Sequence, residues 1–137
     1  MTLQDRYDDA MFDYSMGDLE AAMAKLHGIL AESPQHFEAQ LSLAMCYCRK
    51  GDYLAAIAEG HKAEALNSKE PLVHTNLSLF YVRAGDKQKA EHHGTLARMA
   101  SWREAIAQTP PKPASPPNAV TPERIDGKDA GSTLIRT

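Results

Sequence analysis

The chain has 137 residues, of which 43% are hydrophobic, and a formal net charge of −3 at pH 7. This length and composition fit a single domain with one apolar core. Because the net charge is negative and no basic stripe is sustained, nucleic acid is not expected as the main partner. No apolar run approaches the roughly 20 residues of a membrane helix, so we expect no direct membrane insertion.

The N-terminus and the cysteines predict a cytoplasmic protein. Residues 1–13 are acidic and helical in pattern, unlike the basic and then apolar start of a signal peptide. The only cysteines, Cys46 and Cys48, lie two residues apart on one predicted helix. Their side chains diverge there by roughly 200°, so they cannot bridge each other. We therefore expect reduced thiols and a cytoplasmic location.

Three Gly-Asp pairs, beginning at Gly17, Gly51 and Gly85, recur every 34 residues. This period is the signature of a helical-repeat solenoid. Small residues keep the same register on both sides of each turn, where two helices must touch closely. They are Ala10, Ala44 and Ser78 before the glycines, and Ala22, Ala56 and Ala90 after them. Each unit is therefore predicted to be a helix, a tight turn at Gly-Asp and a second helix.

These landmarks resemble those of the tetratricopeptide repeat family, whose units are 34-residue helix-turn-helix pairs. The resemblance implies an all-α, right-handed solenoid of three helical hairpins, at about residues 3–36, 37–70 and 71–104, within a domain of residues 1–108. The first repeat departs from the other two, because it has Asp9 and Asp13 where they have leucine and tyrosine. We interpret these aspartates as the polar outer face of a terminal repeat.

The last helix is predicted to be one long helix from Lys87 to Gln108, since no proline interrupts this run and its single glycine, Gly94, lies inside the helical pattern. The run Ser101-Trp102-Arg103-Glu104 is also the pattern of a capping box, which would begin a short new helix. Residues 109–137 change character completely. Six prolines between Pro110 and Pro122 predict an extended or disordered, proline-rich tail that contains P-x-x-P spellings. A plain linker and a ligand segment for some groove both remain open for this tail.

Two glycines inside predicted helices, Gly60 and Gly94, lie one period apart. Each costs up to about 1 kcal/mol relative to alanine in a helix interior. Both repeats that carry them have a tyrosine in the preceding helix, at Tyr47 and Tyr81. Our hypothesis is that the tyrosine rings fill the space that the glycines leave.

The sequence contains no motif of an enzyme. A glycine-rich phosphate loop, a nucleophile elbow and an H-E-x-x-H motif are all absent from it. The histidines are the only candidate metal ligands that we single out. The side chains of the adjacent pair His92 and His93 point about 100° apart on a helix, so they do not converge on one ion. We interpret the histidines as surface residues and expect no catalytic residue, no cofactor and no metal.

The resemblance implies that the first helix of each repeat lines a concave, peptide-binding groove. Most residues at the matching positions are apolar, aromatic or sulfur-bearing, which suits an adaptable surface for a partner's side chains. The predicted peptide-binding residues are Tyr7, Met11, Tyr14, Leu41, Met45, Arg49, Leu72, Asn76, Leu79 and Arg83. Asp8 and Ser42 stand at matching positions as well. Asn76 would hydrogen-bond a peptide backbone, and the two arginines would engage carboxylates. Some of these residues, such as Leu41 and Leu79, also suit a core position.

The sequence thus predicts a non-enzymatic protein interaction module, an adaptor or chaperone-like scaffold that binds an apolar segment of another protein or peptide. The nearest alternative within that class is that the chain is similar to the small cytoplasmic secretion chaperones, which also have three such repeats. The alternative is a structural subunit that self-associates through its repeats. Residues 1–36 carry seven acidic side chains against Arg6 and Lys25, whereas residues 71–104 carry three against five basic ones. This asymmetry allows head-to-tail contact between copies in a possible homo-oligomer.

Overall fold

The structure is a computed structural model that describes residues 1–108, and the predicted tail of residues 109–137 lies outside the described part. The described residues form helices and contain no strand. The helices are α1 (Leu3–Ser15), α2 (Leu19–Glu32), α3 (Phe37–Lys50), α4 (Tyr53–Leu66), α5 (Pro71–Ala84) and α6 (Lys87–Gln108). The predicted all-α fold of three helical hairpins is confirmed, and the last helix is a single long one as expected.

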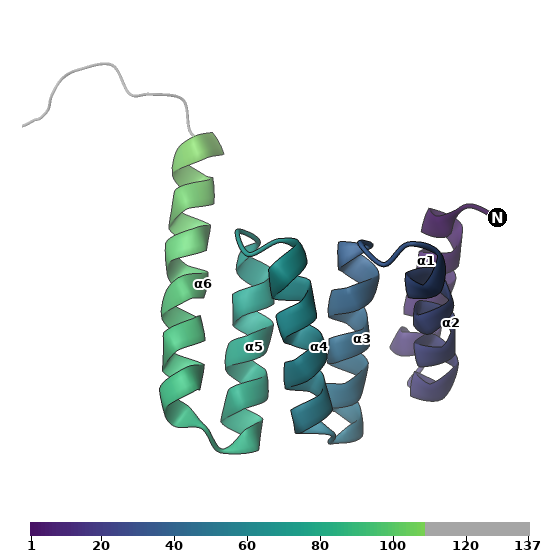
Figure 1. Cartoon of the computed structure of the whole chain (residues 1–137), viewed down its shortest axis with the longest axis horizontal. Coiled ribbons are helices and arrows are strands. Elements are labelled where there is room, and N and C mark those ends of the chain that lie inside the picture. The colour runs from purple at the N-terminus through teal and green to yellow at the C-terminus, as the bar shows by residue number, and fades with distance from the viewer. Residues whose placement is uncertain (109–137) are drawn as a thin grey trace, which may run out of the picture. The chain divides into compact units, whose positions relative to one another are not determined.

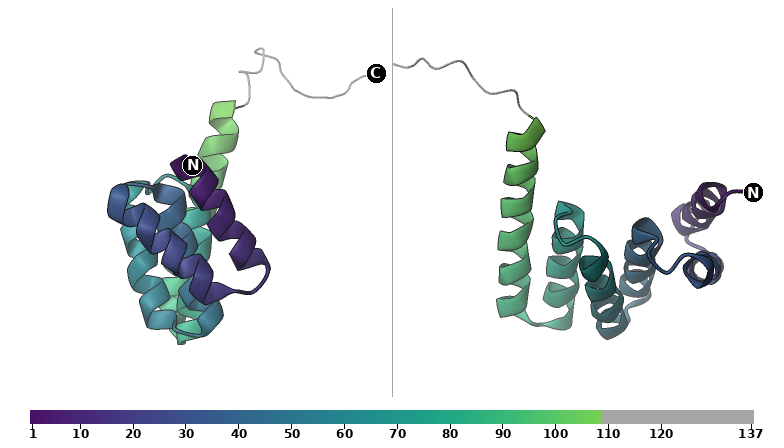
Figure 2. Two further views of the ribbon diagram at one scale, coloured as in Figure 1. Left: turned by 90° about the vertical axis from the view of Figure 1, so that its right-hand side faces the viewer. Right: turned by 45° about the horizontal axis from the view of Figure 1, so that its top comes forward.

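Residues 1–105 form one compact unit, in which the helices follow one another in chain order (Figure 1). Each helix from α1 to α4 packs against the next one, and α3 also contacts α5. Two further views show the same succession (Figure 2). The core consists of two apolar clusters, one centred on Leu26, Ile29 and Leu43 and the other on Val73, Leu77 and Phe80. Successive hairpins therefore share their buried side chains.

The Gly-Asp pairs end one helix and begin the next. Gly17, Gly51 and Gly85 have φ angles of +82°, +89° and +89°, in the left-handed region where a side chain is strained. In the last two turns the amide of the following aspartate donates to the carbonyl of a tyrosine five residues back, at 3.0 and 2.8 Å. This bond is typical of a Schellman helix end. It satisfies a carbonyl that the helix itself leaves without a partner.

The aspartates of the same pairs cap the second helices. The side chain of Asp18 accepts from the amide of Ala21 at 3.2 Å, and Asp52 accepts from Ala55 at the same distance. Asp86 accepts from the amide of Lys89 at 3.1 Å. Replacing such a cap with alanine typically costs about 1 kcal/mol. The Gly-Asp pair thus carries both the stop and the start signal of each hairpin.

The small residues lie at the contacts for which they were predicted. Ala10, Ala22, Ala44 and Ala56 are completely buried, and Ala90 is 4% exposed. Ser78 is only partly buried, but its hydroxyl donates to the carbonyl of Ala90 at 2.7 Å. Both cysteines are buried and free, and burial raises the pKa of the Cys46 thiol to about 11. Among residues 1–108, no helix combines the length and apolar character needed to cross a membrane.

The interpretation of all histidines as surface residues is wrong for His74 and His93, which are 4% and 5% exposed. Their positions in the helices explain this. His93 lies three residues after Ala90 and four before Ala97, so it shares the buried face of α6. His74 lies next to Val73 and three residues before Leu77 on the buried face of α5.

The hypothesis about tyrosines and glycines is also wrong for Gly60. A Cβ atom at this position would lie 2.8 Å from Cδ2 of Leu77 and 3.3 Å from Cε2 of Phe80, so these core side chains fill the space. At Gly94 the nearest atom is the hydroxyl oxygen of Ser78, at an ordinary 3.5 Å. The first glycine is required by close packing, whereas the second leaves room for a methyl group.

This difference predicts opposite effects of one substitution at the two glycines. Gly60→Ala should lower the free energy of unfolding by about 1–3 kcal/mol, because the new methyl group overpacks against Leu77. Gly94→Ala should leave it unchanged or raise it by up to about 1 kcal/mol, because alanine favours the helix. Urea unfolding followed by circular dichroism measures both changes. A Gly60→Ala variant as stable as the original chain would contradict the packing argument.

Candidate functional site

A pocket of about 330 Å³ opens between α1, α3 and α5, the first helices of the three repeats. Its walls are mainly apolar, and the residues from the middle of α1 and α3 stand at equivalent positions one period apart. Met45, for example, is the counterpart of Met11, and Leu41 is the counterpart of Tyr7. The lining residues are Tyr7, Met11, Phe37, Glu38, Leu41, Ser42, Met45, Glu70 and Leu72.

The position of Tyr7 is fixed from two sides. Its hydroxyl oxygen lies 2.9 Å from that of Ser42, within hydrogen-bonding distance. Its ring lies 5.6 Å from the ring of His36, which itself caps α3 by accepting from the amide of Ala39 at 3.1 Å. Burial raises the pKa of Tyr7, so the phenol is protonated at neutral pH. One wall of the pocket is therefore an ordered aromatic ring that ties α1 to the start of α3.

Two carboxylates lie at the pocket, on Glu38 and Glu70. Glu70 caps α5, where its side chain accepts from the amide of Leu72 at 3.4 Å. The carboxylate of Glu38 lies 3.8 Å from Nδ1 of His36 and is largely exposed. The pocket therefore combines apolar walls with a negative charge at the first turn of α3 and at the start of α5.

Half of the predicted groove residues line this pocket, namely Tyr7, Met11, Leu41, Met45 and Leu72. Leu41 is also 4% exposed and belongs to the core, so both roles considered for it apply. Leu79 is 41% exposed, and Arg83 is exposed as well. Neither of them is part of the pocket lining.

Tyr14 and Arg49 interact with each other. The guanidinium of Arg49 donates to the carbonyl of Tyr14 at 3.0 Å and lies 4.7 Å from the centre of the tyrosine ring. A cation over an aromatic face is attracted by the electrons of the ring. The arginine predicted to engage a partner's carboxylate thus joins α1 to α3 within the chain.

Asn76 has a half-buried side chain, and its Nδ2 is buried and makes no hydrogen bond within the described residues. A buried donor without a partner costs about 1–3 kcal/mol. Asn76 stands one period after Ser42, whose hydroxyl is engaged with Tyr7. The equivalent donor in the third repeat is left without an acceptor.

The sequence-based prediction missed the lining residues Phe37, Glu38 and Glu70, which lie at or before the first turn of their helices. A signal for one of them was present. Phe37 precedes Leu41 by four residues and therefore lies on the same helix face one turn earlier. Glu70 is a cap outside the helical periodicity, and it approaches the pocket only because α5 starts beside α3.

Comparison with known proteins identifies the repeats. Residues 13–59 match the model of the tetratricopeptide repeat, which covers the turn of the first hairpin and most of the second. The six-helix arrangement agrees with this match over the rest of the described chain. Residues 13–59 are therefore tetratricopeptide repeats, and the helical hairpins of the other described residues have the same fold. No curated protein matches the sequence.

Solved structures with similar folds include two kinds of repeat protein. The type III secretion translocator chaperone SycD of Yersinia enterocolitica is 25% identical with a TM-score of 0.69, covering 80% of this chain and 78% of that one. SycD in complex with a peptide of the translocator YopD is 21% identical with a TM-score of 0.70, covering 77% and 85%. MamA is 17% identical with a TM-score of 0.72, covering 77% of this chain but only 61% of its own.

The Tyr7–Ser42 contact predicts a measurable coupling between the first two repeats. Tyr7→Phe and Ser42→Ala should each lower the free energy of unfolding by about 0.5–1.5 kcal/mol, because each removes the same hydrogen bond. The double variant should lose less free energy of unfolding than the sum of the two single losses, which is the result of a double-mutant cycle for groups in contact. Tyr53→Phe is the control, since the Tyr53 hydroxyl makes no hydrogen bond with any of residues 1–108. Additive effects of the two substitutions would argue against the bond.

Proposed function

We propose that this protein is an adaptor or chaperone-like module, without enzymatic activity, that holds a short apolar segment of a partner protein in the pocket between α1, α3 and α5. The observation that carries the proposal is the pocket itself, with Tyr7, Met11 and Met45 on its walls. Its volume of about 330 Å³ lies at the lower end of the range for ligand pockets. A few side chains of a peptide therefore suit it better than a large cofactor.

The chemistry of the walls favours apolar side chains. Methionine is flexible and polarisable, so Met11 and Met45 can adjust to side chains of different shape. The ordered Tyr7 ring supplies a rigid contact area at a low cost in conformational entropy. Such a combination of one rigid and two adaptable anchors suits a partner segment rich in leucine, methionine or valine.

The carboxylates of Glu38 and Glu70 add a preference in charge. An apolar segment flanked by lysine or arginine would place its positive charges near these two groups, whereas acidic flanks would be repelled. Both glutamates are partly solvated, so the effect on binding is modest and decreases with salt. The free Nδ2 of Asn76 is a further donor, which would meet a backbone carbonyl of the segment after rotation of its side chain.

A structural relative supports this mode of action. SycD, whose fold is similar, was solved with a peptide of the translocator YopD. At 21% identity this likeness concerns the fold, and the peptide belongs to SycD. A protein partner follows from the repeat family in general, while its identity does not, since this fold serves many functions.

The alternative function is that of a structural subunit that self-associates head to tail. It depends on free acidic groups in the first repeat. Lys25 lies 2.9 Å from Asp9 and 2.5 Å from Asp13, so the two aspartates interpreted as an outer face are paired across the first hairpin. Glu20 pairs with Lys50 and Glu32 with Arg6. Four of the seven acidic residues are therefore engaged within the chain, which weakens the electrostatic case for this alternative.

The pocket predicts selective peptide binding. The probes are two fluorescent synthetic peptides with one shared leucine-rich core, flanked by lysines in one and by glutamates in the other. The lysine-flanked peptide should bind more tightly, and Met45→Glu should weaken its binding by about 1–3 kcal/mol, as expected for a central contact. Fluorescence anisotropy at physiological salt gives both affinities.

Leu54→Glu is the matched control for this experiment. Leu54 is 77% exposed and lies outside the pocket lining, so the variant adds the same charge elsewhere on the chain. It should bind the peptide as the original chain does, and circular dichroism should report equal helicity for both variants. Equal loss of binding in the two variants, or no binding of either peptide, would refute the pocket as the site.

The internal ion pairs predict how the oligomeric state responds to salt. Because four of the seven acidic groups of the first repeat are already in ion pairs, the mass measured by light scattering should be the same at 0.02 M and 0.5 M salt. Screening reaches about 8 Å at 0.15 M, so head-to-tail oligomers held by charge would dissociate in this interval. A mass that falls with rising salt would favour the structural-subunit function.

A further inference from the structure

Three histidines from different helices meet between α4, α5 and α6, at His61, His74 and His93. The centre of the His93 ring lies 5.6 Å from those of both His61 and His74. Glu64, one turn after His61 on α4, lies among them and places its carboxylate 2.9 Å from Nδ1 of His61. This histidine cluster, defined by His61, Glu64, His74 and His93, is separate from the peptide pocket, with which it shares no residue.

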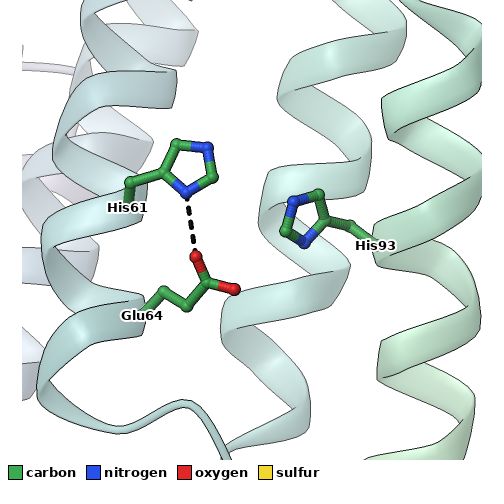
Figure 3. Close-up of side chains that lie close together, drawn as sticks. All are labelled: His61, Glu64 and His93. Carbon is green, nitrogen blue, oxygen red and sulfur yellow. Dashed lines mark hydrogen bonds and ion pairs between the residues drawn. The ribbon is translucent and has the colours of Figure 1, made fainter.

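The cluster has the donors and spacing of a metal site. His61, Glu64 and His93 each offer one ligand atom, and these atoms lie within 4.8 Å of one another. Figure 3 shows His61 and Glu64 on one helix, with His93 facing them from another. In a tetrahedral zinc site with metal–nitrogen distances of about 2.1 Å, neighbouring ligand atoms lie about 3.4 Å apart. Small rotations of the half-buried His61 and Glu64 side chains cover this difference.

His74 supplies a fourth donor. Its Nε2 lies 2.7 Å from the carbonyl oxygen of Ser68, which can only accept, so Nε2 carries the proton and donates. In the neutral ring Nδ1 is then the atom with a free lone pair. This Nδ1 lies 3.4 Å from Nδ1 of His93 and 3.7 Å from Oε2 of Glu64. Both distances are close to the edge of a tetrahedral coordination shell.

We propose that His61, Glu64 and His93, with His74 as the fourth ligand, bind a divalent transition-metal ion of the zinc type. Three imidazoles and one carboxylate suit zinc, whereas calcium and magnesium prefer an all-oxygen shell. Because four protein ligands close the shell, the ion is structural and has no open position for catalysis. It links α6 to α4 and α5 at the C-terminal end of the repeats.

Neighbouring groups orient the ligands as in known metal sites. The Tyr81 hydroxyl lies 2.6 Å from Nε2 of His61, so it holds the ring with Nδ1 toward Glu64. The Tyr81 ring stacks on His93, with ring centres 5.5 Å apart. Outer hydrogen bonds of this kind fix the tautomer and direction of a ligand histidine.

The preceding repeat offers an internal comparison. The residues one period before His74 and His93 are Gln40 and Glu59, and the amide nitrogen of Gln40 donates to the Glu59 carboxylate at 2.7 Å. That pair is a complete hydrogen bond between two helices. One period before Glu64 stands Leu30, which cannot coordinate a metal. One period before His61 stands the exposed His27, so only the last two repeats hold the complete set of donors.

Zinc titration of the full chain tests the proposal. The protein is prepared without a histidine tag, treated with EDTA, and titrated with zinc chloride by isothermal calorimetry at pH 7.5. We expect one zinc ion per chain and a rise in the melting temperature with zinc, since an ion that binds the folded state stabilises it. Cobalt(II) in place of zinc should give the intense visible spectrum of a tetrahedral site.

The variants separate this site from adventitious binding. Glu64→Gln and His93→Gln should each weaken zinc binding at least about 10-fold and abolish the rise in melting temperature. The control is His92→Ala, since His92 is exposed and adjacent to His93 in the sequence, and it should behave as the original chain. Glu64 is only half-buried, so we expect Glu64→Gln to fold. This variant therefore tests zinc binding even if His93→Gln fails to fold. No zinc binding by the original chain, or equal binding by Glu64→Gln, would overturn the proposal.

Discussion

The close contact of two helices at a small residue is the constraint on which the rest of this structure depends. Ala10, Ala22, Ala44 and Ala56 have no exposed surface, and in the third hairpin the Ser78 hydroxyl reaches a backbone carbonyl of α6. Interhelical distance depends on the side chains at the contact, so small residues bring the backbones together. The Gly-Asp turns then return each second helix onto the first. This repeated geometry places three first helices beside one pocket, and it brings residues of α4 and α6 within reach of each other.

Much of the fold was predictable from the sequence because the turn chemistry is local. A glycine with positive φ ends one helix and an aspartate begins the next, so the period of 34 residues was enough to predict all three hairpins.

The site was less predictable. Phe37 and Glu70 reach the pocket from helix starts, outside the positions that the repeat register singles out. Arg49 was expected to engage a partner's carboxylate, and in the structure its guanidinium donates to the carbonyl of Tyr14 and lies over the ring of the same residue. Such pairings depend on distances between helices that spacing alone does not provide.

The histidines illustrate a second reason for the difference between sequence and structure. Along one helix, His92 and His93 diverge, which argued against a metal site. The relevant neighbours of His93 are on other helices, where His74 and Tyr81 of α5 stack against its ring. Helical periodicity carried a partial signal, since His93 shares a face with Ala90 and Ala97. A polar side chain on such an apolar helix face, as that of His93, needs a hydrogen-bonding partner in the core. That partner is expected on a neighbouring helix.

The location of the histidine cluster has a mechanical consequence for a solenoid. Each repeat is stabilised mainly by its neighbours, and a terminal repeat has only one. In this chain the last hairpin also leaves Met99 and Trp102 largely exposed, at 48% and 70%. Polar interactions at the junction of the last two repeats then matter more for holding α6. A metal ion bound there would add to the packing of a terminal repeat, at a place that shares no residue with the pocket on the first helices.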